Sequence, residues 1–398
     1  MTTSSTQLAG PLFQRVPPGA QVALLRILGG IEPDPIGPDR AFLGAPSRRI
    51  PLGWGRPIEP WEAAFILQDI VGCEDFGRGE KLAWEFPLRF EGVAMTLAFE
   101  KFGLRAYVDA SLEEEIATAL AQRMAEQMAR AIPLLKKTVL SAIADEQVTV
   151  GLVNVENHYR RLQRQFAHFK KLSEQSLVTA AETECVTEEL PDGGWRSSNP
   201  AFYIEEEARF EGKAAVHAVF SLLEHLLLIE FFLAGKDPAN GQLAQFIGSG
   251  WTEKFKQVAD LTDSETKRQY DRLVALHEDL RNPAAHGEVE SDGTDFRFIL
   301  PGIGPVATRL VAQKGMRRTY AWTHSTTPDI LAELTEVEKW FASGFLARAI
   351  QYGESELELY FGSDLGAAIA LSSDDPEELD QAIQYVTRMV DDARNMDW

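Results

Sequence analysis

Residues 82–108 alternate between hydrophobic and polar positions, which predicts β structure. The alternation is interrupted at Gly92 and resumes directly after it. The apolar positions of its first run are Trp84, Phe86, Leu88 and Phe90. Because successive strand side chains point to opposite faces of a sheet, we expect a small antiparallel meander with one buried face. Pro87 has no backbone donor, so its strand is expected at a sheet edge.

From Leu112 the hydrophobic spacing changes to that of a helix. Apolar residues recur every four positions, and three glutamates precede them, as suits a helix N-terminus. We expect helices over about residues 112–174, with Pro133 bending or breaking the first of them. The helix at 153–174 combines aromatic with basic residues, a mixture that also contacts nucleic acid. We favour an amphipathic helix with a buried aromatic stripe and a solvated basic face.

A cluster of turn residues at 187–200 is the best linker in the sequence. We therefore divide the chain into an α+β N-terminal region of unknown role, residues 1–190, and a helical domain, residues 200–398. Hydrophobic periodicity predicts a mainly α bundle in the second part, with an inserted β-hairpin at 296–322 and an acidic helix at 376–394. The other helices expected there cover residues 203–233, 251–261, 265–281 and 329–360.

Charge narrows the function classes. Acidic residues outnumber basic ones by 60 to 39, and the net charge of −21 argues against a simple electrostatic binder of nucleic acid. No acidic residue lies between Phe296 and Thr327, however, so we expect a local cationic patch that binds substrate. Its residues are Arg309, Lys314, Arg317 and Arg318.

The sequence also bears on compartment and cofactors. Two cysteines, Cys73 and Cys185, cannot build a disulfide scaffold and lack the spacing of a metal site. Residues 1–30 show no signal-peptide pattern, so we expect a cytoplasmic protein. The most apolar segment, 214–235, contains two histidines and two glutamates, which favours a buried helix over a membrane span. No phosphate-binding glycine loop is found, and neither cofactor nor metal is expected.

The segment 280–287, Leu-Arg-Asn-Pro-Ala-Ala-His-Gly, presents polar groups where a helix must end. Pro283 disfavours helical geometry in the residue before it, and Gly287 can adopt a left-handed turn. Arg281 supplies a fixed cation for phosphate and His286 a proton carrier at neutral pH, the minimal parts for cleaving RNA without a metal. Similar Arg–His spacings occur five times in the chain, so the surrounding residues carry the argument.

The run Arg281–Gly287 resembles the signature of HEPN domains, helical bundles of prokaryotic toxins, abortive-infection and other antiviral proteins, and RNA-targeting CRISPR effectors. The apolar helix at 214–227 and the segment 250–255 resemble further parts of that domain. The resemblance covers about residues 200–360. It implies a metal-independent endoribonuclease whose composite site forms at a homodimer interface, in anti-phage defence or toxin–antitoxin growth control.

The resemblance also implies roles for single residues. His286 would assist attack of the ribose 2′-hydroxyl on phosphorus or protonate the leaving oxygen, Arg281 would stabilise the phosphoryl oxygens, and Asn282 would orient one of the two. Glu224 or Ser221 would match a polar residue of the upstream helix that faces the site. The alternative for both is a solvent-facing or internally satisfied polar group. The implied partners are RNA, a second copy of the chain, and an antitoxin or regulatory protein.

Two other interpretations stay open. Arg281 and His286 both suit a helix C-terminus, because the helix dipole favours cations there, and Pro283 and Gly287 end helices. The domain would then be a non-catalytic HEPN-like dimeric module that binds nucleotide, RNA or a protein. A third interpretation is an enzyme whose active site lies in the N-terminal region. Loss of RNA cleavage on changing His286 would separate the first interpretation from the other two.

Overall fold

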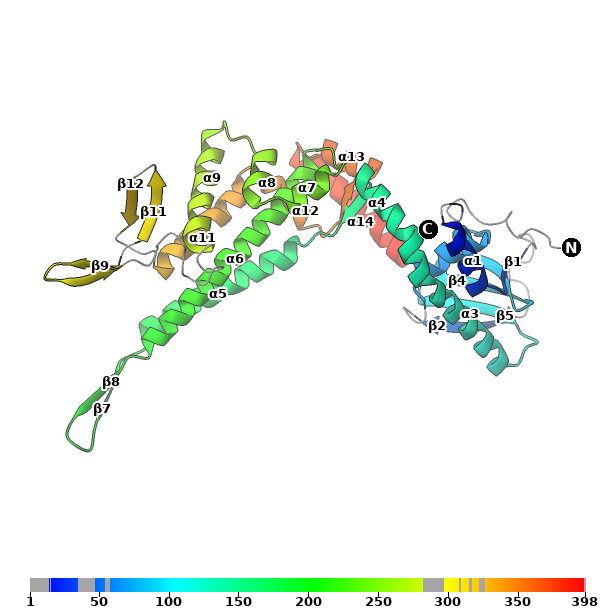
Figure 1. The fold of residues 1–398 in the computed structure, drawn as a ribbon, viewed down its shortest axis with the longest axis horizontal. Coiled ribbons are helices and arrows are strands. Elements are labelled where there is room, and N and C mark those ends of the chain that lie inside the picture. Colours follow the sequence, from blue (N-terminus) through cyan, green and yellow to red (C-terminus); the bar gives the residue numbers. More distant parts are fainter. Residues whose placement is uncertain are drawn as a thin grey trace. The chain divides into compact units, whose positions relative to one another are not determined.

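The computed structural model describes most of the chain, which forms two compact units (Figure 1). Unit 1 comprises residues 1–149 and 385–398, and unit 2 comprises residues 150–384. The described residues are mainly helical, with a small antiparallel sheet region. The described residues are 14, 16–34, 47–53, 58–281, 297–307, 309–314, 317–321 and 326–396.

Unit 1 contains a five-stranded antiparallel sheet with the strand order β1-β3-β4-β5-β2. Its strands are β1 (Ile31–Pro33), β2 (Ser47–Gly53), β3 (Leu82–Phe90), β4 (Val93–Glu100) and β5 (Gly103–Asp109). Strands β3, β4 and β5 pair in sequence order, which confirms the predicted meander. Glu91 and Gly92 join β3 to β4, and both have positive φ, as a two-residue turn that matches the strand twist requires.

The predicted edge position of the Pro87 strand is wrong. β3 lies between β1 and β4, so it is an inner strand. β1 is only three residues long, and its last residue, Pro33, pairs with Leu88. Pro87 therefore lies just past the end of the β1 ladder, where its missing N–H interrupts no hydrogen bond to β1.

Helices cover one face of this sheet. They are α1 (Pro18–Ile27), α2 (Pro60–Phe65), the π-helical turn η4 (Ile66–Val71) and α3 (Glu114–Leu135). The alternating apolar residues of the strands pack against them, as Phe86 and Leu97 do in a core shared with Leu120 and Met124 of α3. Burying each such side chain contributes about 1.5–3 kcal/mol, so the alternation predicted from the sequence is what forms this core.

The first long helix does not end at Pro133, although the sequence predicts a bend or a break there. Pro133 lies inside α3, which continues through the π-helical η5 (Lys136–Leu140) into α4 (Ser141–Val150). Proline removes one backbone donor from the helical ladder. The wider π turn begins three residues later, and such turns are a known way for a helix to absorb an irregularity.

Unit 2 begins with a long helical hairpin. Helix α5 (Tyr159–Glu182) packs antiparallel along α6 (Ala201–Leu233), and two strands, β7 (Val186–Glu189) and β8 (Trp195–Ser198), pair in the connection. The Ser173 hydroxyl on α5 donates to the Ala208 carbonyl on α6 at 2.7 Å. The predicted linker at 187–200 is therefore a β-hairpin inside unit 2, and the predicted division at 190/200 differs from the units observed.

The helix expected at 153–174 begins later, at Tyr159, and ends later. The residues before it form a short strand, β6 (Val153–Val155). This strand pairs with β13 (Leu359–Phe361), which comes late in the sequence of unit 2. The helix expected at 329–360 is likewise divided. It is observed as α11 (Thr327–Ser343) and α12 (Ala347–Gly353), separated at Gly344, and β13 takes the place of its last turn.

Helix α6 is the centre of unit 2, and the other helices pack around it. These are α7 (Gln242–Gly248), α8 (Trp251–Val258), α9 (Ser264–Leu276) with the π turn η6 (His277–Arg281), α11, α12 and α13 (Asp364–Leu371). Among the described helices, α6 alone is long and apolar enough to cross a membrane by those two criteria. Most of its apolar stretch is buried against other parts of the structure, as in the core helix of a globular domain.

Two short hairpins occupy the region where the sequence predicts one. β9 (Arg297–Leu300) pairs with β10 (Gly304–Ala307), and β11 (Arg309–Lys314) pairs with β12 (Arg317–Ala321). The first confirms the inserted hairpin, and the second was not predicted. Gly302 in the turn of the first hairpin and Gly304 at the start of β10 both have positive φ.

The last helix, α14 (Pro376–Asn395), contributes to both units. Its residues up to Gln384 belong to unit 2, and those from Tyr385 onward belong to unit 1. In unit 1 the backbone N–H of Lys81 donates to the Met396 carbonyl at 3.2 Å. Residues far apart in the sequence thus complete unit 1.

Candidate functional site

Arg281 is the one residue of the proposed Arg–Asn–His triad within the described part of the chain. It is the last residue of η6, which extends α9 without a break. Asp263 caps the start of α9 by accepting a hydrogen bond from the Thr266 backbone N–H at 2.8 Å, and Leu273 and Leu276 bury one side of the helix. These local features hold the helix so that its C-terminal arginine lies beside α6.

Glu224 of α6 forms ion pairs with two positively charged side chains. Its Oε1 lies 3.6 Å from Nη2 of Arg281, and its Oε2 accepts a hydrogen bond from Nζ of Lys254 at 2.8 Å. The Lys254 side chain, on α8, is almost fully buried, while those of Glu224 and Arg281 are about three-quarters buried. The carboxylate therefore joins α6, α8 and η6 through charge, and about a quarter of the Arg281 side chain is exposed to solvent.

Aromatic rings complete the surroundings of Arg281. Its guanidinium carbon lies 5.3 Å from the centre of the Phe220 ring, a cation–π contact. His277 meets the same Phe220 ring edge to face at 5.0 Å and lies 5.7 Å from Trp251. Phe220 thus fixes the arginine on one side and a histidine on another.

Two imidazoles near Arg281 have a lowered pKa. Burial, and then the positive charge of Arg281, lower the pKa of His277 below its usual range. The same two causes, in the same order, lower the pKa of His217, one turn before Phe220 on α6. A neutral imidazole can accept a proton, so this part of unit 2 combines fixed cations with proton acceptors.

The structure brings together some of the residues predicted from the sequence and not others. Arg281 and Glu224 form an ion pair, which supports the expectation that a polar residue of the upstream helix faces the motif. Ser221 is exposed, and its hydroxyl donates to the His217 carbonyl of its own helix at 3.2 Å. Among the described residues no contact joins it to Arg281. Asn282 and His286 lie outside the described residues.

The predicted cationic patch falls on the second hairpin of the region, β11–β12. Lys314 pairs directly with Arg317 across the two strands, and Gln313 pairs with Arg318. Arg309 pairs with Ala321 at the other end of the hairpin. The four basic residues therefore belong to one two-stranded ribbon, as their closeness in the sequence suggested.

Lys254, His277 and Phe220 were not singled out from the sequence. His277 precedes Arg281 by four positions on one helix, so the helical period was a signal for it. Lys254 lies between Trp251 and Phe255, whose burial fixes α8, and its contact with Glu224 follows from packing between helices. That contact had no local sequence signal.

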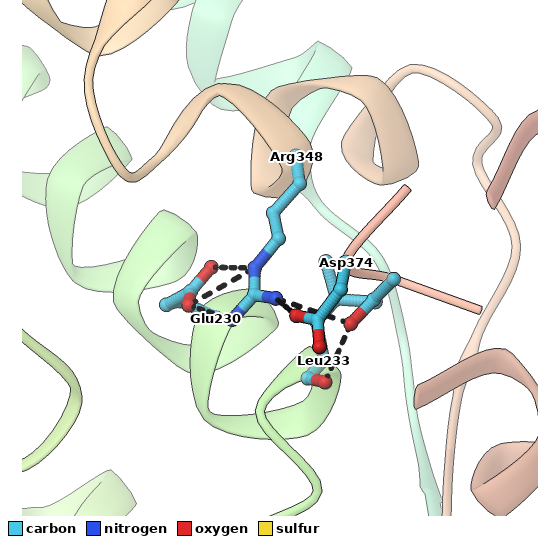
Figure 2. Close-up of polar contacts among 5 residues, drawn as sticks. Glu230, Leu233, Arg348 and Asp374 are labelled. Carbon is cyan, nitrogen blue, oxygen red and sulfur yellow. Dashed lines mark hydrogen bonds and ion pairs between the residues drawn. The ribbon is translucent and has the colours of Figure 1, made fainter. Parts of the chain in front are cut away.

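A second polar cluster lies at the C-terminal end of α6, around Arg348 of α12 (Figure 2). Its Nε lies 3.1 Å from Oε2 and its Nη2 2.5 Å from Oε1 of Glu230, a bidentate pair. Nη1 donates to Asp374 at 2.7 Å and to the Ser373 hydroxyl at 3.2 Å, and that hydroxyl donates to the Leu233 carbonyl at 2.9 Å. The Arg348 guanidinium is thus engaged on every side and links α6, α12 and the chain after α13.

A cavity of about 740 Å³ adjoins Arg348 and is lined by residues from the end of α6 and from α13. Burial raises the pKa of Glu230, which is 3% exposed, and the Arg348 hydrogen bonds oppose that effect. The Arg348 donors are used within the protein, whereas no described residue accepts a hydrogen bond from Arg281. Arg281, with Glu224, Lys254 and Phe220 around it (the Arg281 cluster), is therefore the stronger candidate for chemistry on a phosphate group.

Within the described residues no group of three or more His, Cys, Asp or Glu side chains is placed to hold a metal ion. Of the two cysteines, Cys73 is buried and Cys185 is exposed, in separate units. In comparisons with known proteins, no family model, no curated protein and no solved structure matches the chain.

Proposed function

We propose that this chain is a metal-independent endoribonuclease of the HEPN type, with Arg281 and His286 in its active site. The observation that carries the proposal is the setting of Arg281. Its guanidinium is oriented by Glu224 and Phe220 at a helix end, directly before the Asn282–Gly287 segment that resembles the family signature. We further propose that the helices of unit 2 around α6 form a HEPN-like bundle.

The 3.6 Å separation between Arg281 and Glu224 matters for this function. It is an ion pair but too long for a hydrogen bond, so the guanidinium is held by charge while its N–H groups remain donors for a ligand. A phosphate in front of Arg281 would accept those hydrogen bonds in the bidentate geometry that arginine favours. Lys254 adds a second positive charge to the same cluster.

In the proposed reaction the ribose 2′-hydroxyl attacks the adjacent phosphorus and the bond from phosphorus to the 5′-oxygen breaks. The products are a 2′,3′-cyclic phosphate and a 5′-hydroxyl end. His286 accepts the proton of the attacking hydroxyl or protonates the leaving oxygen, Asn282 orients a catalytic side chain, and Arg281 stabilises the phosphoryl oxygens. A symmetric homodimer would bring two copies of these groups to one cleft.

The test is cleavage of a labelled single-stranded RNA in EDTA by the full chain. We expect the wild type to cut and to leave a 2′,3′-cyclic phosphate, and His286→Ala and Arg281→Ala to lose activity by about 10²-fold or more, as loss of acid–base or charge stabilisation does. EDTA excludes contaminating metal-dependent nucleases from the result.

Arg272→Ala is the matched control. Arg272 lies on the same helix and precedes a histidine by five positions, but it pairs with Glu333 of α11 rather than with the cluster. We expect this variant to cut like the wild type. Equal cutting by all four proteins would refute the site, and retained folding of each variant is checked by circular dichroism.

A non-catalytic binding module is the second candidate, favoured by the two ion pairs of Glu224. Both cations of the cluster have a partner inside the protein, as residues with a purely structural role do. This function predicts no RNA cleavage by the wild type. It also predicts that binding of a fluorescent RNA, measured by polarisation, is unchanged by His286→Ala.

A further inference from the structure

The second face of the unit 1 sheet, opposite the helices, is hollow over β4. Here β4 presents two small side chains, Thr96 and Ala98. By the strand register Thr96 lies between Pro87 and Tyr107, and Ala98 pairs with Glu85. Because these two β4 side chains are short and the side chains on the neighbouring strands are longer, a cavity of about 310 Å³ remains over β4.

Three charged or polar groups at this cavity satisfy one another. One Glu100 oxygen accepts a hydrogen bond from Arg49, and the other accepts one from the Tyr107 hydroxyl. The hydrogen bond to Glu100 raises the pKa of Arg49. Burial, and then the hydrogen bond to Glu100, raise the pKa of Tyr107 to about 12. This network is therefore an ion pair with a protonated phenol, and its net charge is zero.

Two other groups of the cavity have no partner among the described residues. Thr96 is 1% exposed, and its Oγ1 makes no hydrogen bond. Glu85 is 8% exposed, and its carboxylate makes neither a hydrogen bond nor an ion pair with any described residue. Burial, followed by the charges of Asp75 and Glu100, raises the pKa of Glu85. A buried hydroxyl and a buried carboxylate left without partners both cost free energy.

The chemistry of these two groups selects the ligand. Both accept hydrogen bonds. Of the three carboxylates that line the cavity, Arg49 neutralises Glu100 and Glu80 is exposed, so Glu85 is the buried carboxylate without a cation beside it among the described residues. Lys81 and Lys101 also line the cavity, and their ammonium groups bond to Asn395 at 3.4 and 3.2 Å rather than to Glu85. An anion would be repelled by Glu85, whereas a cation with several N–H groups would satisfy both acceptors.

We propose that this cavity binds a small organic cation whose ammonium or amidinium group donates hydrogen bonds to the Glu85 carboxylate and the Thr96 hydroxyl. The apolar body of the ligand lies against Ala98, Leu82 and Phe102, which line the remainder of the cavity. Its volume is at the lower end of the range for small-molecule sites. Unit 1 thereby carries a ligand site of its own, independent of the arginine cluster in unit 2.

The experiment is isothermal titration calorimetry of the full chain with benzamidine, which joins an amidinium to a flat apolar body. Benzamide, which is neutral, and benzoate, which is an anion, have nearly the same shape and serve as comparisons. We expect benzamidine to bind at least tenfold more tightly than either. Absence of benzamidine binding up to 10 mM, or tighter binding of benzoate, would overturn the proposal.

Variants assign the binding to the two acceptors. Glu85→Gln is expected to weaken benzamidine at least tenfold, and Thr96→Val, which keeps the shape and removes the hydroxyl, to weaken it about three- to tenfold. Glu126→Gln, on the exposed side of α3, removes a carboxylate elsewhere in unit 1 and should leave the affinity unchanged. Thr96→Val keeps the test decisive if Glu85→Gln does not fold, and unchanged affinity in the folded variants would contradict the site.

Discussion

His225 shows at the scale of one residue how burial makes stability depend on pH. It lies on α6, is 8% exposed, and its Nε2 accepts a hydrogen bond from the His158 backbone N–H at 2.9 Å. Protonation of Nε2 would break that bond. Burial, followed by the charges of His158 and Arg161, lowers the pKa of His225 to about 4.

The lowered pKa of His225 makes the protein less stable toward acid pH. Because the folded pKa is below the unfolded value of about 6.5, the unfolded state takes up the proton first, and the free energy of unfolding falls as the pH falls from about 6.5 to about 4. We expect this residue to account for a loss of about 3 kcal/mol over that range. Urea unfolding of wild type and His225→Gln at several pH values measures it, as the variant should lack this part of the slope.

The exposed His168 on α5 provides the control. His168→Gln should retain the wild-type slope, because the side chain makes no buried hydrogen bond of this kind. If His225→Gln and the wild type had the same slope between pH 6.5 and 4, the buried neutral histidine would not contribute to acid sensitivity.

At the scale of elements, the Glu230–Arg348 pair fixes α12 against the C-terminal part of α6. Arg348→Met removes the cation and leaves Glu230 buried without a partner, so we expect a loss of about 3–5 kcal/mol in the free energy of unfolding. The loss should be larger at pH 8 than at pH 5, because an unpaired buried carboxylate titrates above its unfolded value and then opposes folding as the pH rises.

A double variant separates the cost of the orphaned charge from the value of the pair. Glu230→Leu together with Arg348→Met removes both charges and should regain most of the loss, since an apolar pair can replace a buried ion pair. Arg268→Met breaks the exposed pair with Glu265 and should change stability by less than about 1 kcal/mol. Additive losses in the double variant would contradict the argument.

The elements that could be predicted from the sequence are those whose apolar residues form a recognisable pattern. The β3–β5 meander shows the alternation of strands, and α6 contains a long run of mostly apolar residues that becomes a buried helix. All eight residues of β7 and β8 are exposed, so no alternation marks them and their turn residues resemble a linker. β6 and β13 are three residues long, too short for a period, and form because the fold brings them together.

The same reasoning applies to the candidate site. Arg281 was predicted because Pro283 and Gly287 mark the helix end, and Glu224 because a carboxylate on an apolar helix is conspicuous. The contact of Lys254 with Glu224 depends on how α8 packs on α6, which no local pattern reports. The pairing of Arg348 with Glu230 joins residues 118 positions apart. It also depends on how helices pack, so no local sequence pattern predicts it.

At the scale of the whole molecule, unit 1 depends on residues from both ends of the sequence. Met396 is buried in it, and Lys81 and Lys101 both bond to the segment Asn395–Met396. We expect deletion of residues 385–398 to raise the hydrogen exchange of the β3–β5 amides while those of α6 keep their protection.

Leu379→Ala is the converse test. Leu379 is fully buried on the part of α14 that belongs to unit 2, so its truncation should reduce the protection of unit 2 helices and leave the β3–β5 amides unchanged. Equal effects of the deletion and of Leu379→Ala on both sets of amides would mean that the units do not respond separately.

The shared helix α14 also sets an order of events during synthesis. The strands of unit 1 leave the ribosome first, but the residues that close the unit, 385–396, follow the whole of unit 2. At roughly 5–20 residues per second, the ribosome needs roughly ten to fifty seconds to translate 150–384. Throughout that interval the nascent sheet lacks the contacts of Lys81 and Lys101 with residues 395–396, and at its end all residues of unit 2 have been synthesised. The proposed nuclease is thus complete before the unit that precedes it in the sequence.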